Sequence, residues 1–172
     1  MKPKTVISVL IVCFVLILLF VLGSAKKGGT VALVQGITAG SDTATSSLVA
    51  SEISYDFGTI SMKNGNVSRD FVLTNSANND LTIRGLETSC MCTTAFLVEP
   101  DGSTKGPFGM PGMGGMTAMR EMIPAGGSRT VRVIYDPNAH GPAGVGAIDR
   151  FVTITENSGA KLQLEIKAVV TP

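Results

Sequence analysis

Alternation of apolar and polar side chains, with a period of two, is the strongest pattern in the second half of the chain. It is clearest near the end, in a run whose apolar members are Leu162, Leu164, Ile166, Ala168 and Val170. Polar side chains stand between the first four of these. Successive side chains of a β-strand point to opposite faces, so the pattern predicts a strand with one buried face.

Six earlier segments show the same alternation between clusters of turn residues. The chain contains 20 glycines and no tryptophan, a composition that suits short strands joined by turns. Asn64–Gly65 predicts a β-hairpin, because this pair readily adopts positive φ. The prediction is an all-β fold, an Ig-like antiparallel β-sandwich of about seven strands. The expected strands are 52–57, 67–75, 81–88, 93–98, 128–135, 151–155 and 162–170.

An uncharged apolar run extends from Val6 to Gly23. As a helix it would be ~27 Å long, close to the ~30 Å of a bilayer core. One interpretation is an uncleaved N-terminal transmembrane helix, and the other is a cleaved signal peptide with a small-residue site at residues 23–25. The expected organisation is an anchor or signal sequence at 1–25, a flexible linker at 26–50 and an Ig-like domain at 51–172.

Charge and flanking residues bear on the partners of the chain. There are 14 basic and 13 acidic residues, and without a basic stripe nucleic acid is not an expected partner. The expected partners are the membrane, through residues 6–23, and an unidentified protein. Lysines flank the apolar run equally on both sides, so they do not set its orientation. The short N-terminal tail favours a single-pass cell-membrane protein with its C-terminal domain outside the cytoplasm.

Several short motifs, in this order, carry a family resemblance: residues 55–60, 71–75, 81–83, 89–93 and 135–137. Residues 52–170 thereby resemble a bacterial Ig-like family catalogued as a domain of unknown function (number fifteen seventy-three), which is similar to the Ig-like domains of Hydin-type proteins. The family signature is Ser-Cys-Gly-Cys-Thr, and Met91 here replaces the central glycine. The resemblance implies a sandwich fold, export or membrane anchoring, and no enzyme activity.

Cys90 and Cys92 hold two of the three sulfhydryl groups in the chain. On a flat strand both side chains would share one face, with Cα atoms ~6.6 Å apart. A disulfide between them therefore requires a kink or turn. Three interpretations stay open: two small buried residues that close a strand, half of a soft-metal site, and a redox-active or bridged pair. Cys13 lies inside the apolar run, and we interpret it as a small lipid-facing hydrophobic residue.

Residues 100–126 are expected to form a long loop rich in Gly, Pro and Met, and five methionines recur at every third position between residues 110 and 122. This step does not match a helix, but it fits an extended polyproline-type run in which every third side chain aligns. Thioethers on one edge of a loop suit Cu(I), whereas calcium and magnesium would need carboxylates. The alternatives are an apolar plug over one end of the sandwich and a partner-binding surface. The methionines are Met110, Met113, Met116, Met119 and Met122.

His140 is the single histidine of the chain. In an Ig-like sandwich, the connections after the third and fifth predicted strands lie at the same pole, so His140 is expected near Cys90 and Cys92. Two sulfurs and an imidazole suit Cu(I), and zinc less well, because structural zinc sites usually have four ligands and a wider cysteine spacing. The alternative is an exposed histidine in a turn.

Enzyme signatures are missing from the sequence: it has no Gly-x-Ser-x-Gly elbow, and its Gly-rich 106–115 segment lacks the Lys-Ser/Thr of a phosphate loop. The leading hypothesis is a membrane-anchored, non-enzymatic Ig-like module for binding or envelope architecture. A copper-binding or copper-handling protein, with Cu(I) held by Cys90, Cys92, His140 and the methionines, is the first alternative. An extracytoplasmic thiol-redox partner is the second.

Overall fold

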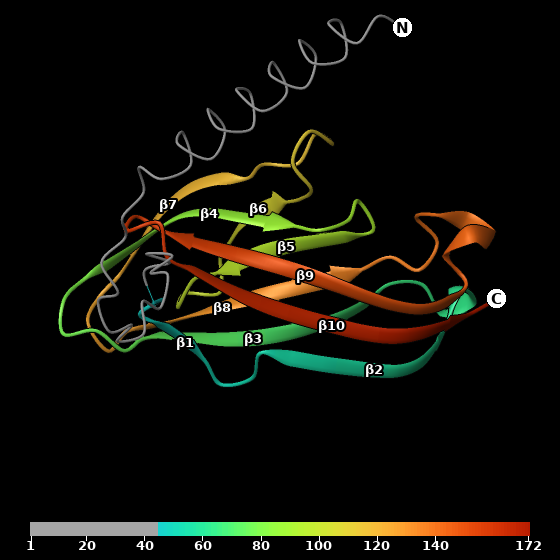
Figure 1. Ribbon diagram of the computed structural model, residues 1–172, viewed down its shortest axis with the longest axis horizontal. Helices are drawn as coiled ribbons and strands as arrows, with labels where there is room; N and C mark the ends of the chain where they lie inside the picture. Colours follow the sequence, from blue (N-terminus) through green and yellow to red (C-terminus); the bar gives the residue numbers. More distant parts are fainter. Residues whose placement is uncertain (1–44) are drawn as a thin grey trace, which may run out of the picture. The chain divides into compact units, whose positions relative to one another are not determined.

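Two packed β-sheets form the domain in the computed structural model, which describes residues 45–172 (Figure 1). The expected transmembrane helix and most of the expected linker lie outside these residues. Within residues 45–172, no helix is long and apolar enough to cross a bilayer.

The first sheet has the order β1 (Leu48–Ala50), β3 (Val67–Asn75), β8 (Ser128–Tyr135), β5 (Thr93–Val98) and β6 (Thr104–Phe108). The second has the order β2 (Ser54–Ser61), β10 (Lys161–Thr171), β9 (Gly146–Glu156), β4 (Leu81–Thr88) and β7 (Ala118–Ile123).

The all-β sandwich predicted from the sequence is confirmed, with ten strands in residues 45–172 where about seven were expected. β3, β5 and β8 have the predicted bounds. The three additional strands, β1, β6 and β7, are all short edge strands. Their sequences lack a clean alternation, because an edge strand shares its pairing with one neighbour only and contributes few buried side chains.

The expected β-hairpin at Asn64–Gly65 is wrong. β2 and β3 belong to different sheets, and the short 3-10 helix η1 (Met62–Asn64) carries the chain from one to the other. Gly65 has a φ of 74°, so the positive φ was predicted correctly. β2 instead pairs in parallel with β10, so the sandwich is not wholly antiparallel. The local turn signal could not tell a hairpin from a crossing between layers, because both need the same backbone reversal.

The expected long loop at 100–126, with an extended polyproline-type run of methionines, is also wrong. β6 and β7 occupy its two ends, one in each sheet. Between them the chain closes on itself through hydrogen bonds from Gly109 N to Met116 O (3.1 Å) and from Met113 N to Met110 O (3.2 Å). A Cβ on Gly115 would lie 2.7 Å from Gly109 Cα, so this closure needs glycine there. We call residues 109–117 the methionine loop.

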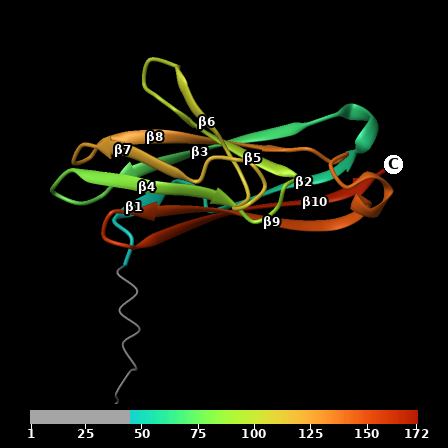
Figure 2. The same cartoon turned by 90° about the horizontal axis from the view of Figure 1, so that it is seen from above.

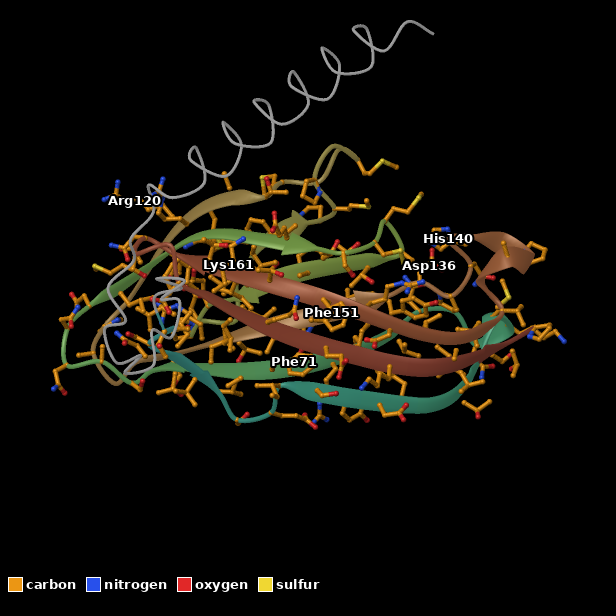
Figure 3. The ribbon with its side chains drawn as sticks, in the orientation of Figure 1. Phe71, Arg120, Asp136, His140, Phe151 and Lys161 are labelled. Carbon is orange, nitrogen blue, oxygen red and sulfur yellow. A yellow bond between two sulfur atoms is a disulfide. The ribbon has the colours of Figure 1, made fainter. Side chains whose placement is uncertain are left out.

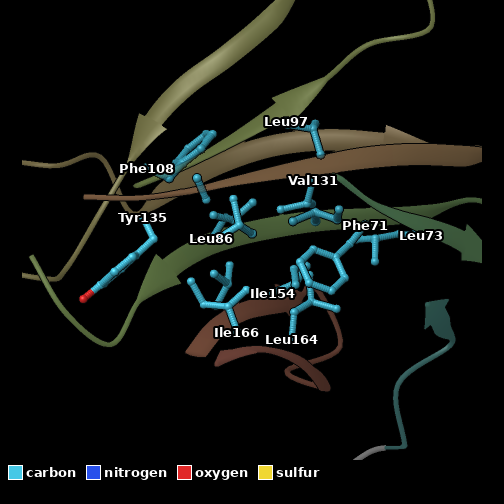
Figure 4. Close-up of a cluster of buried hydrophobic side chains, with 14 of the residues drawn as sticks. Phe71, Leu73, Leu86, Leu97, Phe108, Val131, Tyr135, Ile154, Leu164 and Ile166 are labelled. Atoms are coloured by element: carbon cyan, nitrogen blue, oxygen red, sulfur yellow. The ribbon is translucent and has the colours of Figure 1, made fainter. Parts of the chain in front are cut away.

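One hydrophobic core fills the space between the sheets. Figure 4 shows side chains from both layers meeting there, including Phe71 and Val131 from one sheet and Leu86 and Ile154 from the other. The view from above in Figure 2 shows the strands of both layers running along the same long axis. The predicted inward residues of β10 from Leu164 to Val170 are buried. Burial at about 25 cal/mol per Å² of apolar surface is the main driving force for this arrangement.

Different polar contacts close the two open sides of the sandwich. On one side, the guanidinium of Arg69 in β3 lies 4.1 Å from the ring centroid of Tyr55 in β2 and pairs with Glu52. On the other side, Lys105 of β6 and Arg129 of β8 both pair with Glu121 of β7. The second cluster joins edge strands of opposite sheets, so it ties the layers together where the core ends.

Glu121 is the central member of that second cluster, and its side chain is buried. Burial raises the pKa of the Glu121 carboxyl, but the hydrogen bonds from Lys105 and Arg129 outweigh burial and hold the pKa below its usual range. The hydrogen bonds to Glu121 and Glu99 raise the pKa of Lys105. The ionised form of Glu121 is therefore the form that stabilises the fold.

Glu121→Gln should lower the free energy of unfolding at pH 7 by about 1–2 kcal/mol, because Lys105 and Arg129 lose one of their two carboxylate partners and keep only Glu99. A carboxyl with a depressed pKa stabilises the fold above its unfolded pKa and loses this effect as the pH falls through the folded one. The difference between wild type and variant should therefore shrink as the pH falls from about 5 toward 3. Denaturant unfolding of both proteins at pH 7 and pH 3 measures this difference in the free energy of unfolding.

Glu87→Gln is the matched control, since no ion pair of Glu87 is found within residues 45–172. It should change stability by less than about 0.5 kcal/mol. A difference for Glu121→Gln that stays constant between pH 7 and pH 3 would contradict the assignment.

Candidate functional site

The connection between β4 and β5 is a tight turn, residues 89–92, which we call the cysteine tip. Thr93 N donates to Cys90 O at 3.1 Å and closes the turn. The Cα atoms of Cys90 and Cys92 are 5.2 Å apart, and the two sulfurs form a disulfide. The sequence predicted that a bridge here needs a turn, and the turn brings the Cα atoms closer than a flat strand would.

Two buried threonines support the tip from below. Thr88, at the end of β4, donates its hydroxyl hydrogen to Cys90 O and Thr93 O, each at 3.0 Å. Thr93, at the start of β5, is buried beside it, and its Oγ1 lies 3.8 Å from Cys92 Sγ. Because the turn carbonyls are satisfied by a buried side chain, the tip is held rigidly on the end of the core.

Neighbouring strands also bind the tip through their backbones. Asp136 N, after β8, donates to Cys92 O at 2.9 Å. Ser89 N donates to Phe151 O in β9, and Phe151 N donates back to Ser89 Oγ, both at 2.9 Å. The tip is therefore fixed to both sheets, since β8 belongs to one and β9 to the other.

His140 follows β8, in the connection that leads to β9. Its Nε2 lies 3.1 Å from Cys90 Sγ, and the ligand atoms of Cys90, Cys92 and His140 all lie within 4.8 Å of one another. Figure 3 shows His140 beside Asp136 at this end of the sandwich. Asn138 anchors the connection with a hydrogen bond to Met62 O at 2.9 Å. The predicted closeness of the histidine to the cysteine pair is thus confirmed.

Arg150 of β9 is a member of the site that the sequence analysis missed. Its Nε donates to Cys92 Sγ at 3.2 Å, and one terminal nitrogen donates to Asp149 O at 2.8 Å. Burial raises the pKa of the nearby Tyr135 hydroxyl, and the charge of Arg150 partly offsets this effect. No motif marked Arg150, because its contact with Cys92 exists only once β9 lies beside the tip.

Three thioethers gather next to the tip. Met91 of the tip, with Met110 and Met113 of the methionine loop, lines a pocket of about 300 Å³ whose floor includes Phe108. All three methionines are exposed, whereas Phe108 is buried. Thr88 N donates to Gly109 O at 3.2 Å, and this bond holds the loop against the end of β4. The pocket is therefore rich in thioethers but mixed in polarity, since Thr93 and Thr94 also line it, and it adjoins the cysteine tip through Met91.

The remaining methionines of the predicted set do not join this group. Met116 is exposed and forms an isolated bridge with Phe108. Met122 pairs with Thr82 in the β4–β7 ladder, at the end of β4 remote from the tip. Met119 packs against the core and lines a separate pocket with Arg120. In Figure 3, Arg120 and His140 lie at opposite ends of the sandwich. The methionines therefore do not align along one edge.

The oxidised tip and the reduced tip offer different chemistry. With the disulfide formed, the exposed groups are one disulfide, one imidazole and the thioethers of the pocket. When the disulfide is reduced, two thiolates and the His140 imidazole become available, a donor set that suits a soft cation. Arg150 then lies against the Cys92 thiolate, where its positive charge stabilises the anion.

The fold and the site define a small all-β sandwich domain with a disulfide at one pole. Residues 48–101 match the family model described as "Protein of unknown function (DUF1573)", and this segment runs from β1 past β5 and includes the cysteine tip. The match supports the resemblance seen in the sequence. None of the curated proteins compared with the chain matches it.

Solved structures with a similar fold have low sequence identity. A protein of unknown function from Porphyromonas gingivalis W83 is 17% identical with a TM-score of 0.52, over 74% of this chain and 48% of that one. The chain thus spans about half of that protein's length. The ASH/PapD-like domain of human CEP192 is 11% identical with a TM-score of 0.48, over 83% of this chain and 98% of that one. The Porphyromonas gingivalis structure supports the fold alone.

Thr88→Val keeps the shape of the side chain but removes the hydroxyl that serves two carbonyls of the tip. We expect the free energy of unfolding to fall by about 1 kcal/mol, because Thr93 O loses its hydroxyl donor and Cys90 O keeps only the bond from Thr93 N. Thr153→Val, on the same sheet in β9, is the control and should change stability by less than about 0.5 kcal/mol. Chemical denaturation of both variants measures this, and equal effects would show that Thr88 does not support the tip.

Proposed function

We propose that this chain is a membrane-anchored, non-enzymatic binding module whose Ig-like domain is displayed outside the cytoplasm. The apolar run of residues 6–23 would provide the anchor. The domain contacts its partner through the cysteine tip and the methionine-lined pocket beside it. The partner is another protein of the cell envelope that presents an apolar segment to this surface.

The observation that carries this proposal is a rigid tip surrounded by exposed thioethers. Met91, Met110 and Met113 are exposed around a pocket with an apolar floor, yet the backbone that carries Met91 is fixed to both sheets. Methionine side chains adapt to irregular apolar partners. A fixed backbone also reduces the entropy that binding costs. A rigid backbone that carries adaptable thioethers suits recognition of an apolar side chain better than a flexible, solvated loop does.

The surroundings of His140 support a non-enzymatic role. Its Nε2 faces a disulfide sulfur, whereas hydrolytic catalysis by a triad needs a histidine that faces a nucleophilic hydroxyl or thiol. Loops at the end of a sandwich are typical contact surfaces in domains of this architecture. Binding at the tip therefore accounts for the arrangement without a catalytic step.

Site-specific photo-crosslinking in intact cells of the native host tests the binding surface. A benzoylphenylalanine side chain replaces Met113 in one strain and Val169 of β10 in the other; these residues are 56% and 48% exposed. We expect a discrete protein adduct from position 113 that disappears when Met91 and Met110 are both changed to serine. Position 169 should give no such adduct.

Loss of the adduct in the serine variants links it to the pocket rather than to general exposure. Adducts of the same mass from both positions, or an adduct from position 113 that survives the serine changes, would refute the proposed surface. Thermal unfolding of the serine variants confirms that they are folded before the comparison is made.

A copper-handling role is the second candidate, and one observation favours it. Cys90, Cys92 and His140 place three soft-metal donors within 4.8 Å of one another, and Met91 extends the sulfur surface toward the pocket. The disulfide ties up both cysteine sulfurs. Cu(I) would therefore bind at the cysteines only in the reduced protein, while the oxidised protein offers thioethers alone.

Anaerobic Cu(I) titration against a bicinchoninate competitor separates these sites. The full chain is used in detergent with Cys13 changed to alanine, so that only the tip cysteines respond. The reduced protein should bind one Cu(I) at least about tenfold more tightly than the oxidised protein, because two thiolates join the donor set. Cys90→Ser combined with Cys92→Ser should remove this difference, and His140→Asn should weaken it.

Met119→Leu combined with Met122→Leu is the matched control, because neither residue lies with the tip group. It should leave Cu(I) affinity unchanged, whereas Met91→Leu with Met110→Leu should lower it. Equal affinity of the reduced wild type and the double cysteine variant would exclude copper binding at the cysteines.

A further inference from the structure

The two sulfurs of the tip disulfide have different surroundings. Cys92 is 2% exposed, and Arg150 Nε donates to its sulfur at 3.2 Å. Cys90 is partly exposed and lies between the exposed residues Ser89 and Met91. The sulfur of Cys90 contacts His140 Nε2, and its environment contains no guanidinium contact among those found in residues 45–172. Cys90 is therefore the more accessible of the two cysteines, and the Cys92 sulfur is enclosed beside a guanidinium.

We propose that the Cys90–Cys92 disulfide is a polarised site for thiol–disulfide exchange. A thiol of low molecular weight, or a protein thiol, reacts at Cys90, and Cys92 is the leaving group. This activity would occur on the same surface as the proposed binding, but it does not depend on any protein partner. It assigns to Arg150 a chemical role that the fold itself does not require.

The exchange balances in two steps. The entering thiol first loses its proton to solvent, and its thiolate attacks Cys90 Sγ. A new sulfur–sulfur bond forms to Cys90, and the bond to Cys92 breaks with its electron pair on Cys92. A second thiolate then attacks the entering sulfur, which releases an oxidised disulfide of the reagent and the Cys90 thiolate. Overall, two thiols are oxidised to a disulfide, and the tip disulfide is reduced to a dithiol.

Arg150 favours departure of Cys92 over departure of Cys90. Exchange is faster when the leaving thiolate is stabilised, and hydrogen bonds that involve an ionised partner are about twice as strong as neutral ones. The Nε–H group already points at Cys92 Sγ in the oxidised protein, so no rearrangement is needed when negative charge develops there. After the second step, His140 Nε2 is placed to hydrogen-bond the Cys90 sulfur.

The contacts that hold the tip also favour attack at Cys90 over attack at Cys92. Cys92 lies at the edge of the core, with its carbonyl bound by Asp136 N and its own N–H directed at Cys90 Sγ at 3.3 Å. A reagent that approached Cys92 would have to displace this packing. Attack at Cys90 meets less packing, because Cys90 is partly exposed and both of its neighbours in the chain are exposed, whereas Cys92 is buried.

The experiment uses the full chain in detergent, in a Cys13→Ala background, with a chelator present to exclude metals. Reduced glutathione is the reagent, and N-ethylmaleimide stops the reaction at intervals. Cyanogen bromide then cleaves after Met91 and separates the two cysteines into the peptides 63–91 and 92–110. Mass spectrometry locates the first glutathione adduct, which we expect on the peptide that contains Cys90, with maleimide on the one that contains Cys92.

Rates of the first step test the role of Arg150. Arg150→Gln should slow reduction about tenfold, the effect of losing one charge-assisted hydrogen bond to the leaving sulfur. Arg150→Lys should restore part of the rate, because it keeps the charge without the planar guanidinium. Arg84→Gln removes the same charge from an exposed position in β4, distant from the sulfurs, and should leave the rate unchanged.

Thermal unfolding of each variant in the oxidised form controls for general damage to the fold. The proposal is overturned if glutathione appears first on Cys92, or if Arg150→Gln and Arg84→Gln reduce at the same rate while both are folded. The glutathione experiment needs no protein partner. A negative result would therefore refute the exchange proposal without bearing on the photo-crosslinking test of the binding surface.

Discussion

Burial of one apolar face from each sheet is the constraint on which the rest of the structure depends. The ten strands of residues 45–172 contribute side chains to one shared core, and this burial supplies most of the folding free energy. The polar contacts are arranged around the core. Arg69 with Tyr55 closes one side, and Lys105 and Arg129 with Glu121 close the other. At the pole opposite the cysteine tip, the two hydrogens of the buried Asn75 amide are shared among three backbone carbonyls.

The cysteine tip derives its chemical character from this frame. Thr88 is buried because β4 is a central strand, and its hydroxyl can then serve the tip carbonyls. β9 lies beside β4, so Arg150 reaches Cys92. The connection after β8 lies at the same end and places His140 against Cys90. A rigid disulfide between an imidazole and a guanidinium thus follows from strand order. The proposed binding surface, the alternative copper site and the proposed thiol exchange all depend on this one arrangement.

Much of the fold could be predicted from the sequence, because side-chain alternation reports directly on which face of a strand is buried. β3, β5 and β8 were predicted with their observed bounds. The turn at Gly65 before β3 was predicted, but the sequence did not show that this turn carries the chain from one sheet to the other. β6 and β7 were missed because glycine, proline and methionine obscure a period of two. The spacing of the methionines suggested one aligned edge, whereas a closed loop and a strand separate them into different groups.

By itself, the sequence determined the sandwich class, the need for a turn between the cysteines and the closeness of His140 to them. These features depend on local periodicity and on the general order of loops in a sandwich. Only the tertiary structure decided that Arg150 contacts Cys92, that Met91 joins Met110 and Met113, and that Met119 and Met122 stay apart from them. Such contacts join residues far apart in the chain, and they are set by sheet order and strand register, which local alternation does not encode.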